Sequence, residues 1–185
     1  FPTYVSCDFG FRFPGIVVFQ VETNTKGLPT IYQIDEIAMK QNVKTEDLAS
    51  MVKALPYPIA AYFGDPAGGG RSSQSGISDI EVFRRKGMRI RFRKDSMTRN
   101  VVNGVSHVRR WFEDANGDAH IFVSSKCKGS IQSYENYRYP QNKSEQSVKE
   151  EPLKDGVYDH QCDALRYGIC NLFPIKSRQA GVIDW

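Results

Sequence analysis

The fold of this chain is indicated most clearly by one stretch, Ile59-Ala60-Ala61-Tyr62-Phe63-Gly64-Asp65-Pro66. Its first six residues form an apolar run without the alternation of a half-exposed strand, which is typical of a strand buried on both faces of a parallel sheet. Asp65 and Pro66 end the run with residues that favour turns. Residues 59–64 are therefore predicted to form a buried strand.

The sequence directly before this strand has the period of a helix. Apolar residues at positions 48, 51, 52 and 55 repeat at helical spacing, Thr45 can cap the helix, and Pro56 ends the pattern. Three β-rich runs stand earlier in the chain, at residues 4–8, 15–21 and 30–37, and predict a three-strand meander. The meander, the helix and the buried strand together make a β-α-β pattern.

Helices and strands continue to alternate after residue 64. Further helices are predicted over 77–86, over 96–112, around 131–137 and from about 157 to the residue before Pro174, and further strands over 88–93 and 120–124. This order predicts an α/β fold with a mixed sheet, in which a three-strand meander is followed by parallel strands with flanking helices. The outline is that of a ribonuclease H-like fold. A doubly wound, flavodoxin-like sheet is the alternative, because periodicity does not reveal strand order.

The length of 185 residues suits one hydrophobic core. We expect one domain over residues 1–173 and a C-terminal tail over 174–185. Residues 138–156 are polar and interrupted by prolines, and they are predicted to form a hairpin-like insertion in which residues 137–139 pair with 147–149.

Composition excludes several classes of protein. No apolar run approaches the roughly 20 residues that span a bilayer, which excludes a membrane-spanning segment and predicts no membrane partner. The four cysteines include no Cys-x-x-Cys pair, which argues against a zinc cluster or a disulfide framework and favours a reducing, intracellular setting. The N-terminus has no signal-peptide pattern and begins abruptly, as a fragment would.

Two carboxylates follow predicted strands. Asp8 ends the first strand and Asp65 ends the fourth, and the carboxyl ends of neighbouring parallel strands meet at one edge of an α/β sheet. Each residue alone also fits ordinary turn chemistry, since Asp before Gly or Pro is common in turns. Asp35 and Glu36 end the third strand, where alternation lets only one of them face such a site, and we expect them to be exposed.

A third acidic group lies in the last predicted helix. Asp159 and Asp163 are four residues apart, and His160 is three residues before Asp163, so the three side chains project to one side. Carboxylates there repel each other unless a cation or strong donors hold them. An ordinary reading is that Asp159 caps the helix.

The whole set is rich in oxygen, which suits Mg²⁺ or Mn²⁺ better than zinc. Such a site can hold two ions about 4 Å apart and hydrolyse a phosphodiester. Removal of one carboxylate from a cluster of this kind is expected to stabilise the metal-free protein, if it changes stability at all.

Three motifs resemble one protein family. These are Asp8-Phe9-Gly10, Tyr62-Phe63-Gly64-Asp65-Pro66-Ala67-Gly68 and Asp159-His160-Gln161-Cys162-Asp163-Ala164-Leu165-Arg166-Tyr167-Gly168. Their order is similar to that in the nuclease domain of the large terminase subunit of tailed bacteriophages. The resemblance covers nearly the whole chain and implies a ribonuclease H-like, Mg²⁺- or Mn²⁺-dependent endonuclease. Such an enzyme cuts concatemeric double-stranded viral DNA, with little sequence preference, when packaging starts and ends.

The resemblance also implies roles and partners. Asp8, Asp65 and Asp163 would be the catalytic, metal-binding triad, with His160 as a catalytic group and Asp159 as a further metal ligand. The implied partners are double-stranded DNA, the ATPase motor domain of the same subunit, the small terminase subunit and the portal protein. The implied location is the host cell cytoplasm, transiently at the procapsid portal. Large terminases carry a P-loop, and no Gly-x-x-x-x-Gly-Lys-Ser/Thr occurs here, so we expect an excised nuclease domain.

Residues 84–99 are strongly basic, with eight basic residues and one acidic residue. Most such runs are solvated surface. The alternation predicted over 88–93 places three arginines on one side of a strand, where they can contact phosphates without reading sequence. The DNA-binding candidates are Arg84, Arg85, Arg89, Arg91 and Arg93.

Two other functions fit the same residues. A junction resolvase or transposase can share this fold and acidic triad. A non-catalytic DNA-binding packaging module would use the acids only as caps and turns. Branched substrates and metal titration distinguish these alternatives.

Overall fold

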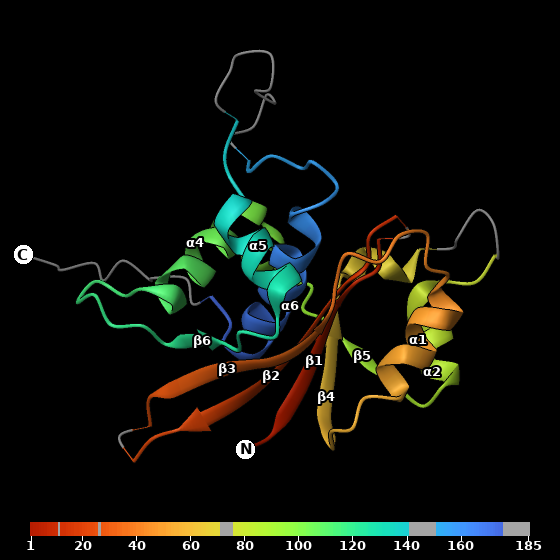
Figure 1. Cartoon of the computed structure of the whole chain (residues 1–185), viewed down its shortest axis with the longest axis horizontal. Helices are drawn as coiled ribbons and strands as arrows, with labels where there is room; N and C mark the ends of the chain where they lie inside the picture. The colour runs from red at the N-terminus through yellow and green to blue at the C-terminus, as the bar shows by residue number, and fades with distance from the viewer. Residues whose placement is uncertain (11, 26, 71–75, 141–150, 176–185) are drawn as a thin grey trace, which may run out of the picture.

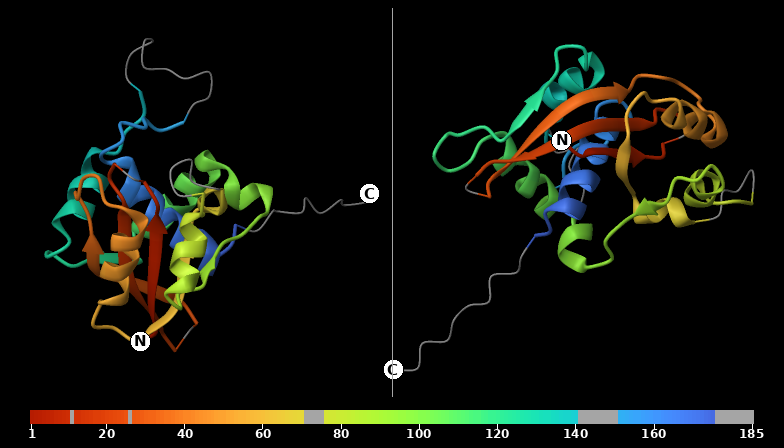
Figure 2. Two further views of the ribbon diagram at one scale, coloured as in Figure 1. Left: turned by 90° about the vertical axis from the view of Figure 1, so that its right-hand side faces the viewer. Right: turned by 90° about the horizontal axis from the view of Figure 1, so that it is seen from below.

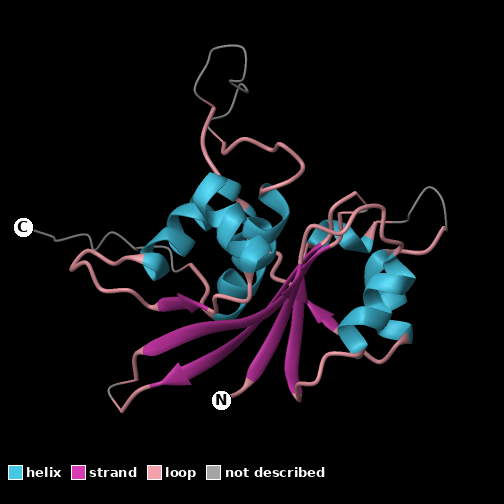
Figure 3. Cartoon of the chain, viewed as in Figure 1, coloured by secondary structure: helices cyan, strands magenta, loops and turns pink. Residues whose placement is uncertain are grey.

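The computed structural model describes residues 1–10, 12–25, 27–70, 76–140 and 151–175. Within them, six strands form one sheet in the order β5-β4-β1-β2-β3-β6 (Figures 1 and 3). The strands are β1 Thr3–Asp8, β2 Gly15–Thr23, β3 Pro29–Ile37, β4 Ile59–Gly64, β5 Ile90–Arg91 and β6 Ile121–Val123. The helices are α1 Thr45–Lys53, η1 Pro66–Gly69 (a 3₁₀ helix), α2 Asp79–Arg85, α3 Ser96–Arg99, α4 Val101–Phe112, α5 Lys128–Asn136 and α6 Asp159–Leu172.

The strand directions decide between the two predicted folds. β2 runs antiparallel to β1 and β3, whereas β4 is parallel to β1, β5 to β4, and β6 to β3. A flavodoxin-like sheet has a different order and lacks the antiparallel strand in its centre. The predicted mixed sheet, with a meander followed by parallel strands, is therefore confirmed.

Helices cover both faces of the sheet. α1 and α2 lie on one side and α4, α5 and α6 on the other (Figures 1 and 2). Successive side chains of a strand point to opposite faces, so Val18 packs with the α1 and α2 residues while Val17 and Phe19 pack with those of α6. α6 lies so close to the sheet that a methyl group on Gly168 would come within 3.1 Å of Ser6 Cβ.

One predicted helix is in fact two. Asn100 has an extended backbone (φ −70°, ψ 121°) and separates α3 from α4. Asp95 accepts a hydrogen bond from the Thr98 amide and caps α3, and the Asn100 side chain accepts from the Asn103 amide and caps α4. The predicted strand over 88–93 shortens to Ile90–Arg91, although the apolar and basic residues around it alternate as expected.

Two predicted helix caps are wrong. Thr45 is the first residue of α1, and its hydroxyl donates to Asp79 of α2 instead of capping its own helix. α6 begins at Asp159, with Tyr158 in the cap position, so Asp159 belongs to the first turn and does not cap the helix.

The predicted hairpin is only partly described. Residues 147–149 and the turn before them lie outside the described residues. Residues 137–139 are described and are not a strand, and the Leu153 amide donates to the Arg138 carbonyl at 2.8 Å. None of the described helices is long and apolar enough to cross a membrane. All four cysteines are free thiols.

Candidate active site

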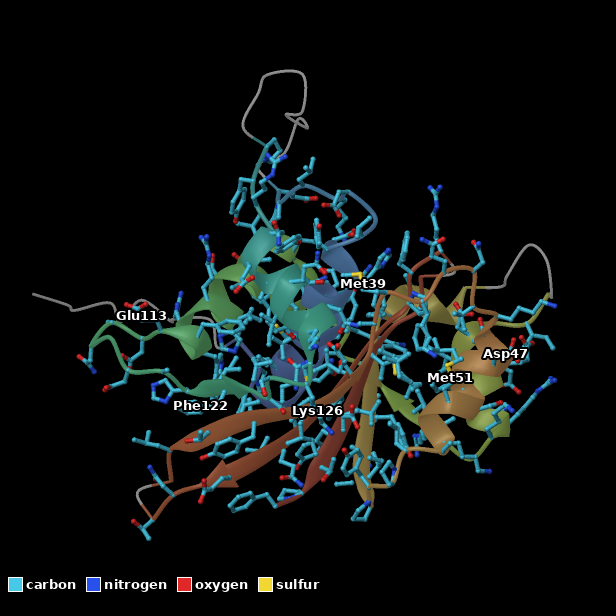
Figure 4. All side chains as sticks on the ribbon, in the orientation of Figure 1. Met39, Asp47, Met51, Glu113, Phe122 and Lys126 are labelled. Atoms are coloured by element: carbon cyan, nitrogen blue, oxygen red, sulfur yellow. The ribbon has the colours of Figure 1, made fainter. Side chains whose placement is uncertain are left out.

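Asp8 and Asp65 lie side by side at the carboxyl edge of the sheet. β1 and β4 are parallel neighbours, and Cys7 is paired with Gly64, so the next residue of each strand is a carboxylate at the same level. Met39, two residues after the end of β3, lies at this edge in Figure 4. The expected convergence of the two strand ends is thus found in the structure.

His160 joins Asp8 from the first turn of α6. Its Nδ1 is 2.6 Å from Asp8 Oδ2, and because an ionised carboxylate only accepts, the imidazole donates. The approach depends on glycine, since a Cβ on Gly10 would lie 2.6 Å from the imidazole Cε1 and a Cβ on Gly15 would overlap the His160 carbonyl. The sequence around Asp8 therefore makes room for α6.

The electrostatics of this pair reflect the nearby acids. Burial raises the pKa of Asp8, the hydrogen bond from His160 opposes that rise, and the negative charges of Asp163 and Asp65 add to it. The same hydrogen bond raises the pKa of His160 against the effect of burial. Asp8 thus interacts electrostatically with both other members of the predicted triad.

Asp163 is held by two cations of the chain itself. Its side chain is 3% exposed; Oδ1 accepts from Arg166 Nε at 3.1 Å and Nη2 at 2.9 Å, and Oδ2 lies 2.5 Å from Lys154 Nζ. Burial opposes ionisation, yet the positive charges of Arg166 and Lys154 lower the pKa of Asp163. Arg166 reaches this position because Gly104 of α4 leaves space for its side-chain methylenes.

Asp159 and Asp65 have contrasting surroundings. Asp159 is buried, its pKa is raised by that burial, and its Oδ1 has no hydrogen-bond partner among the described residues. Asp65 Oδ1 accepts from the Ala67 amide at 2.8 Å and so caps η1. The turn role weighed for Asp65 is therefore real, and it engages only one of the two carboxylate oxygens.

The acidic side chains of this site are candidate donors for a divalent cation. No three His, Cys, Asp or Glu side chains of the described residues surround a single point as in a preformed metal site. A cation between these carboxylates would nevertheless give the buried Asp159 oxygen a partner. It would also stabilise the ionised form of Asp8, whose pKa is raised in the metal-free chain. The oxygen-rich set fits Mg²⁺ or Mn²⁺ if Asp163 exchanges Lys154 for the ion.

The basic run divides into separate places. Arg84 and Arg85 of α2 both bond to Glu81, with the nearest contacts at 2.7 and 3.1 Å. Arg89 and Arg91 are exposed around the short β5, and Arg93 pairs with Asp95 at 2.9 Å. The run is therefore not one continuous patch.

The acids at the end of β3 and two cationic residues of the site differ from what the sequence predicted. Asp35 accepts a hydrogen bond from Tyr57 and pairs with Lys126. Glu36 accepts from the Gly129 and Ser130 amides at the start of α5, so neither acid is simply exposed. Arg166 and Lys154 were not predicted as site residues. The i, i+3 spacing of Asp163 and Arg166 carries a signal for their pairing, whereas nothing in the irregular segment before α6 singles out Lys154.

The chain is similar in fold to a protein of known structure. No family model matches the chain. The solved nuclease domain of the P22 large terminase superposes with a TM-score of 0.65 over 90% of this chain and 79% of that one, at 16% sequence identity. This chain has the fold of a large terminase nuclease domain. The predicted resemblance and ribonuclease H-like fold class are thus confirmed.

A sequence comparison finds a second similar protein, which is also described as a large terminase subunit. Over 74 residues, 40% of its length, the chain is 27% identical to the protein described as terminase, large subunit, of Escherichia phage T5. The matched region spans 16% of the length of that relative.

Proposed function

We propose that this chain is the nuclease domain of a viral DNA-packaging terminase, a metal-dependent endonuclease that cuts concatemeric double-stranded DNA with little sequence preference. The proposal rests on the placement of Asp8 beside Asp65 at the carboxyl edge of a sheet with the fold of a terminase nuclease domain. His160 is hydrogen-bonded to Asp8, and the charge of Asp163 raises the pKa of Asp8. Open α/β sheets place their sites at this edge.

Mg²⁺ or Mn²⁺, as two ions, would be held by Asp8, Asp65, Asp163 and Asp159. When bound, the metal supplies an activated water and stabilises the leaving oxygen of a phosphodiester. The chain itself contributes a fixed imidazole: Asp8 holds the Nδ1 proton of His160 and leaves Nε2 as the nitrogen able to exchange a proton with a substrate oxygen.

The partners proposed for the whole subunit follow the same line. They are the ATPase motor domain of the same polypeptide, the small terminase subunit and the portal protein, with action in the host cytoplasm at the procapsid portal. The support for them is the similarity to the large subunit of phage T5.

A plasmid-cleavage assay with Mg²⁺, Mn²⁺ and a chelator tests the proposal. Asp65→Asn keeps a side chain that can cap η1, so its expected loss of cleavage reports on the carboxylate charge rather than on the turn. Asp47→Asn is the matched control, because Asp47 is an exposed acid in the first turn of α1 (Figure 4) and not one of the proposed site residues. Full activity in Asp65→Asn would remove the site assignment.

Substrate choice separates the rival functions. A terminase nuclease is expected to cut linear duplex DNA, whereas a resolvase would prefer a branched junction. A non-catalytic packaging module would bind DNA and leave it intact under every metal condition.

A further inference from the structure

A cleft opens beside Asp65, between η1 and the segment that follows β5. Its volume is about 620 Å³, within the range of roughly 300–1,000 Å³ that ligand pockets usually have. One wall is formed by η1, another by residues 92–101, and α6 contributes Arg166 and Tyr167. One side of the cleft is thus lined by a carboxylate of the proposed active site.

The charge of this cleft is positive. Its lining residues include one acid, Asp65, and five bases: Arg93, Lys94, Arg99, Lys154 and Arg166. Three of the bases are already engaged, because Lys154 and Arg166 hold Asp163 and Arg93 pairs with Asp95. The remaining two, Lys94 and Arg99, are exposed and form no ion pair with any described residue.

We propose that this cleft holds phosphates of the DNA strand that passes Asp65, with Lys94 and Arg99 as its cationic contacts. The inference rests on the proposed nuclease function, and it names the part of the protein along which the strand runs. Lys94 lies over the Phe92 ring and neither base has an ion-pair partner among the described residues, so both can attract a polyanion into a cleft that Asp65 lines. Phosphate contacts of this kind position DNA without reading its sequence.

The placement differs from that of the other basic residues. Arg84 and Arg85 share Glu81 as a partner and belong to α2, whose Val82 and Phe83 pack in the core on the α1 side of the sheet. Neither arginine lines the cleft. The two pairs therefore carry equal charge at different places, which makes them a matched comparison.

The test measures DNA affinity in chelator, so that cutting does not interfere. Binding of a fluorescent 30-base-pair duplex is followed by anisotropy over a series of KCl concentrations, for the wild type, for Lys94→Gln with Arg99→Gln, and for Arg84→Gln with Arg85→Gln. The first double variant is expected to bind at least tenfold more weakly and to lose about 1.8 from the log–log salt slope, about 0.9 for each contact. The second is expected to bind within about twofold of the wild type.

A charge-conserving variant, Lys94→Arg with Arg99→Lys, is expected to restore binding and guards against a misfolded glutamine variant. The inference is overturned if the two glutamine variants have the same affinity for the duplex, or if the α2 variant has the lower affinity. It is also overturned if the wild type does not bind the duplex. Plasmid cleavage by the wild type is scored separately. Cleavage together with binding through α2 would keep the proposed function and reject the cleft, and binding through the cleft without cleavage would do the reverse.

Discussion

Lys154 Nζ lies 2.5 Å from Asp163 Oδ2, and this contact places a cation of the chain on the carboxylate that was expected to bind metal. The other oxygen of Asp163 is taken by Arg166, so both oxygens have cationic partners in the structure. The side chain of Lys154 is 48% exposed, whereas that of Asp163 is 3% exposed. Of the two cations, Lys154 is therefore the one that can leave without exposing buried surface.

The first prediction follows from competition for this oxygen. Lys154→Gln is expected to raise the affinity for Mn²⁺ about tenfold. A hydrogen bond between charged groups contributes about 1.5–3 kcal/mol, and the partial exposure of Lys154 favours the lower end of that range. An energy of about 1.36 kcal/mol corresponds to a factor of ten in affinity. Isothermal titration without DNA measures it. Lys126→Gln is the control, since Lys126 pairs with Asp35 instead. Equal or weaker Mn²⁺ binding by Lys154→Gln would show that the ammonium does not compete with the ion.

The second prediction concerns stability without metal. Removal of one carboxylate from the cluster was expected to stabilise the metal-free protein, but the opposite is expected for Asp163, because Asp163→Asn leaves the buried Arg166 guanidinium without its counter-charge. Its free energy of unfolding is expected to fall by roughly 3–5 kcal/mol. Asp8→Asn is expected to keep or raise stability, within about 1 kcal/mol, because burial and two neighbouring acids already disfavour its charge. Urea unfolding in chelator compares the two, and equal losses would contradict the contrast.

The third prediction concerns His160. Its replacement by Ala is expected to slow single-turnover cleavage by about 10²-fold or more without abolishing Mn²⁺ binding, as losses of acid–base groups do. Rates from pH 5.5 to 9 should change shape as well as height. In the metal-free chain, NMR is expected to give His160 a pKa above the ordinary histidine value, because its hydrogen bond to Asp8 favours the protonated imidazole. The pKa of His160 is expected to be lower in Asp8→Asn. Superimposable rate profiles would reduce His160 to a structural residue.

Sequence periodicity was sufficient for the elements that face the core. Most of the apolar run of β4 packs on one or the other face of the sheet, as predicted, although Ala60 is exposed; the alternation of the meander likewise follows from burial. The position of Asp8 and Asp65 was predictable for the same reason, since parallel neighbours end at one edge. The break at Asn100 was missed because an apolar stripe continues across it, although Asn is itself a preferred helix cap.

Contacts between irregular segments were beyond prediction from periodicity. Lys154 belongs to no helix or strand, so its neighbours depend on how the chain enters α6. The basic run is divided for a different reason: Glu81 pairs with Arg84 and Arg85 through helical spacing, whereas Lys94, after β5, and Arg99, the last residue of α3, line the cleft. Charge counts in a sequence record the number of arginines and not their partners.

The fourth prediction tests the packing of α6 on the sheet. A Cβ on Gly168 would lie 2.8 Å from a ring carbon of Phe19, which is fully buried. Gly168→Ala is therefore expected to lower the free energy of unfolding by roughly 1–3 kcal/mol, as overpacking of a core does. Gly69→Ala is the control, because its nearest neighbour would be 3.8 Å away. Chemical denaturation of both variants measures the effect, and equal stabilities would mean that α6 can shift at no cost.

The fifth prediction concerns His107, whose Nε2 is 2.7 Å from the Phe173 carbonyl at the end of α6. Burial lowers its pKa, the Phe173 contact opposes this, and the positive charge of Arg110 adds to the lowering. The unfolded chain, with an ordinary His pKa of about 6.5, therefore takes up a proton at higher pH than the folded chain does. As pH falls through that value, this residue makes unfolding progressively easier.

His107→Gln keeps an N–H donor for Phe173 and removes the titration. Relative to the wild type, the variant is expected to gain stability as pH is lowered from 7.5 to 5.5, measured as the difference in unfolding free energy at each pH. Taking the difference cancels the carboxylates and His160, which titrate in both proteins. A gap that stays constant with pH would mean that His107 is as easily protonated in the folded chain as in the unfolded one.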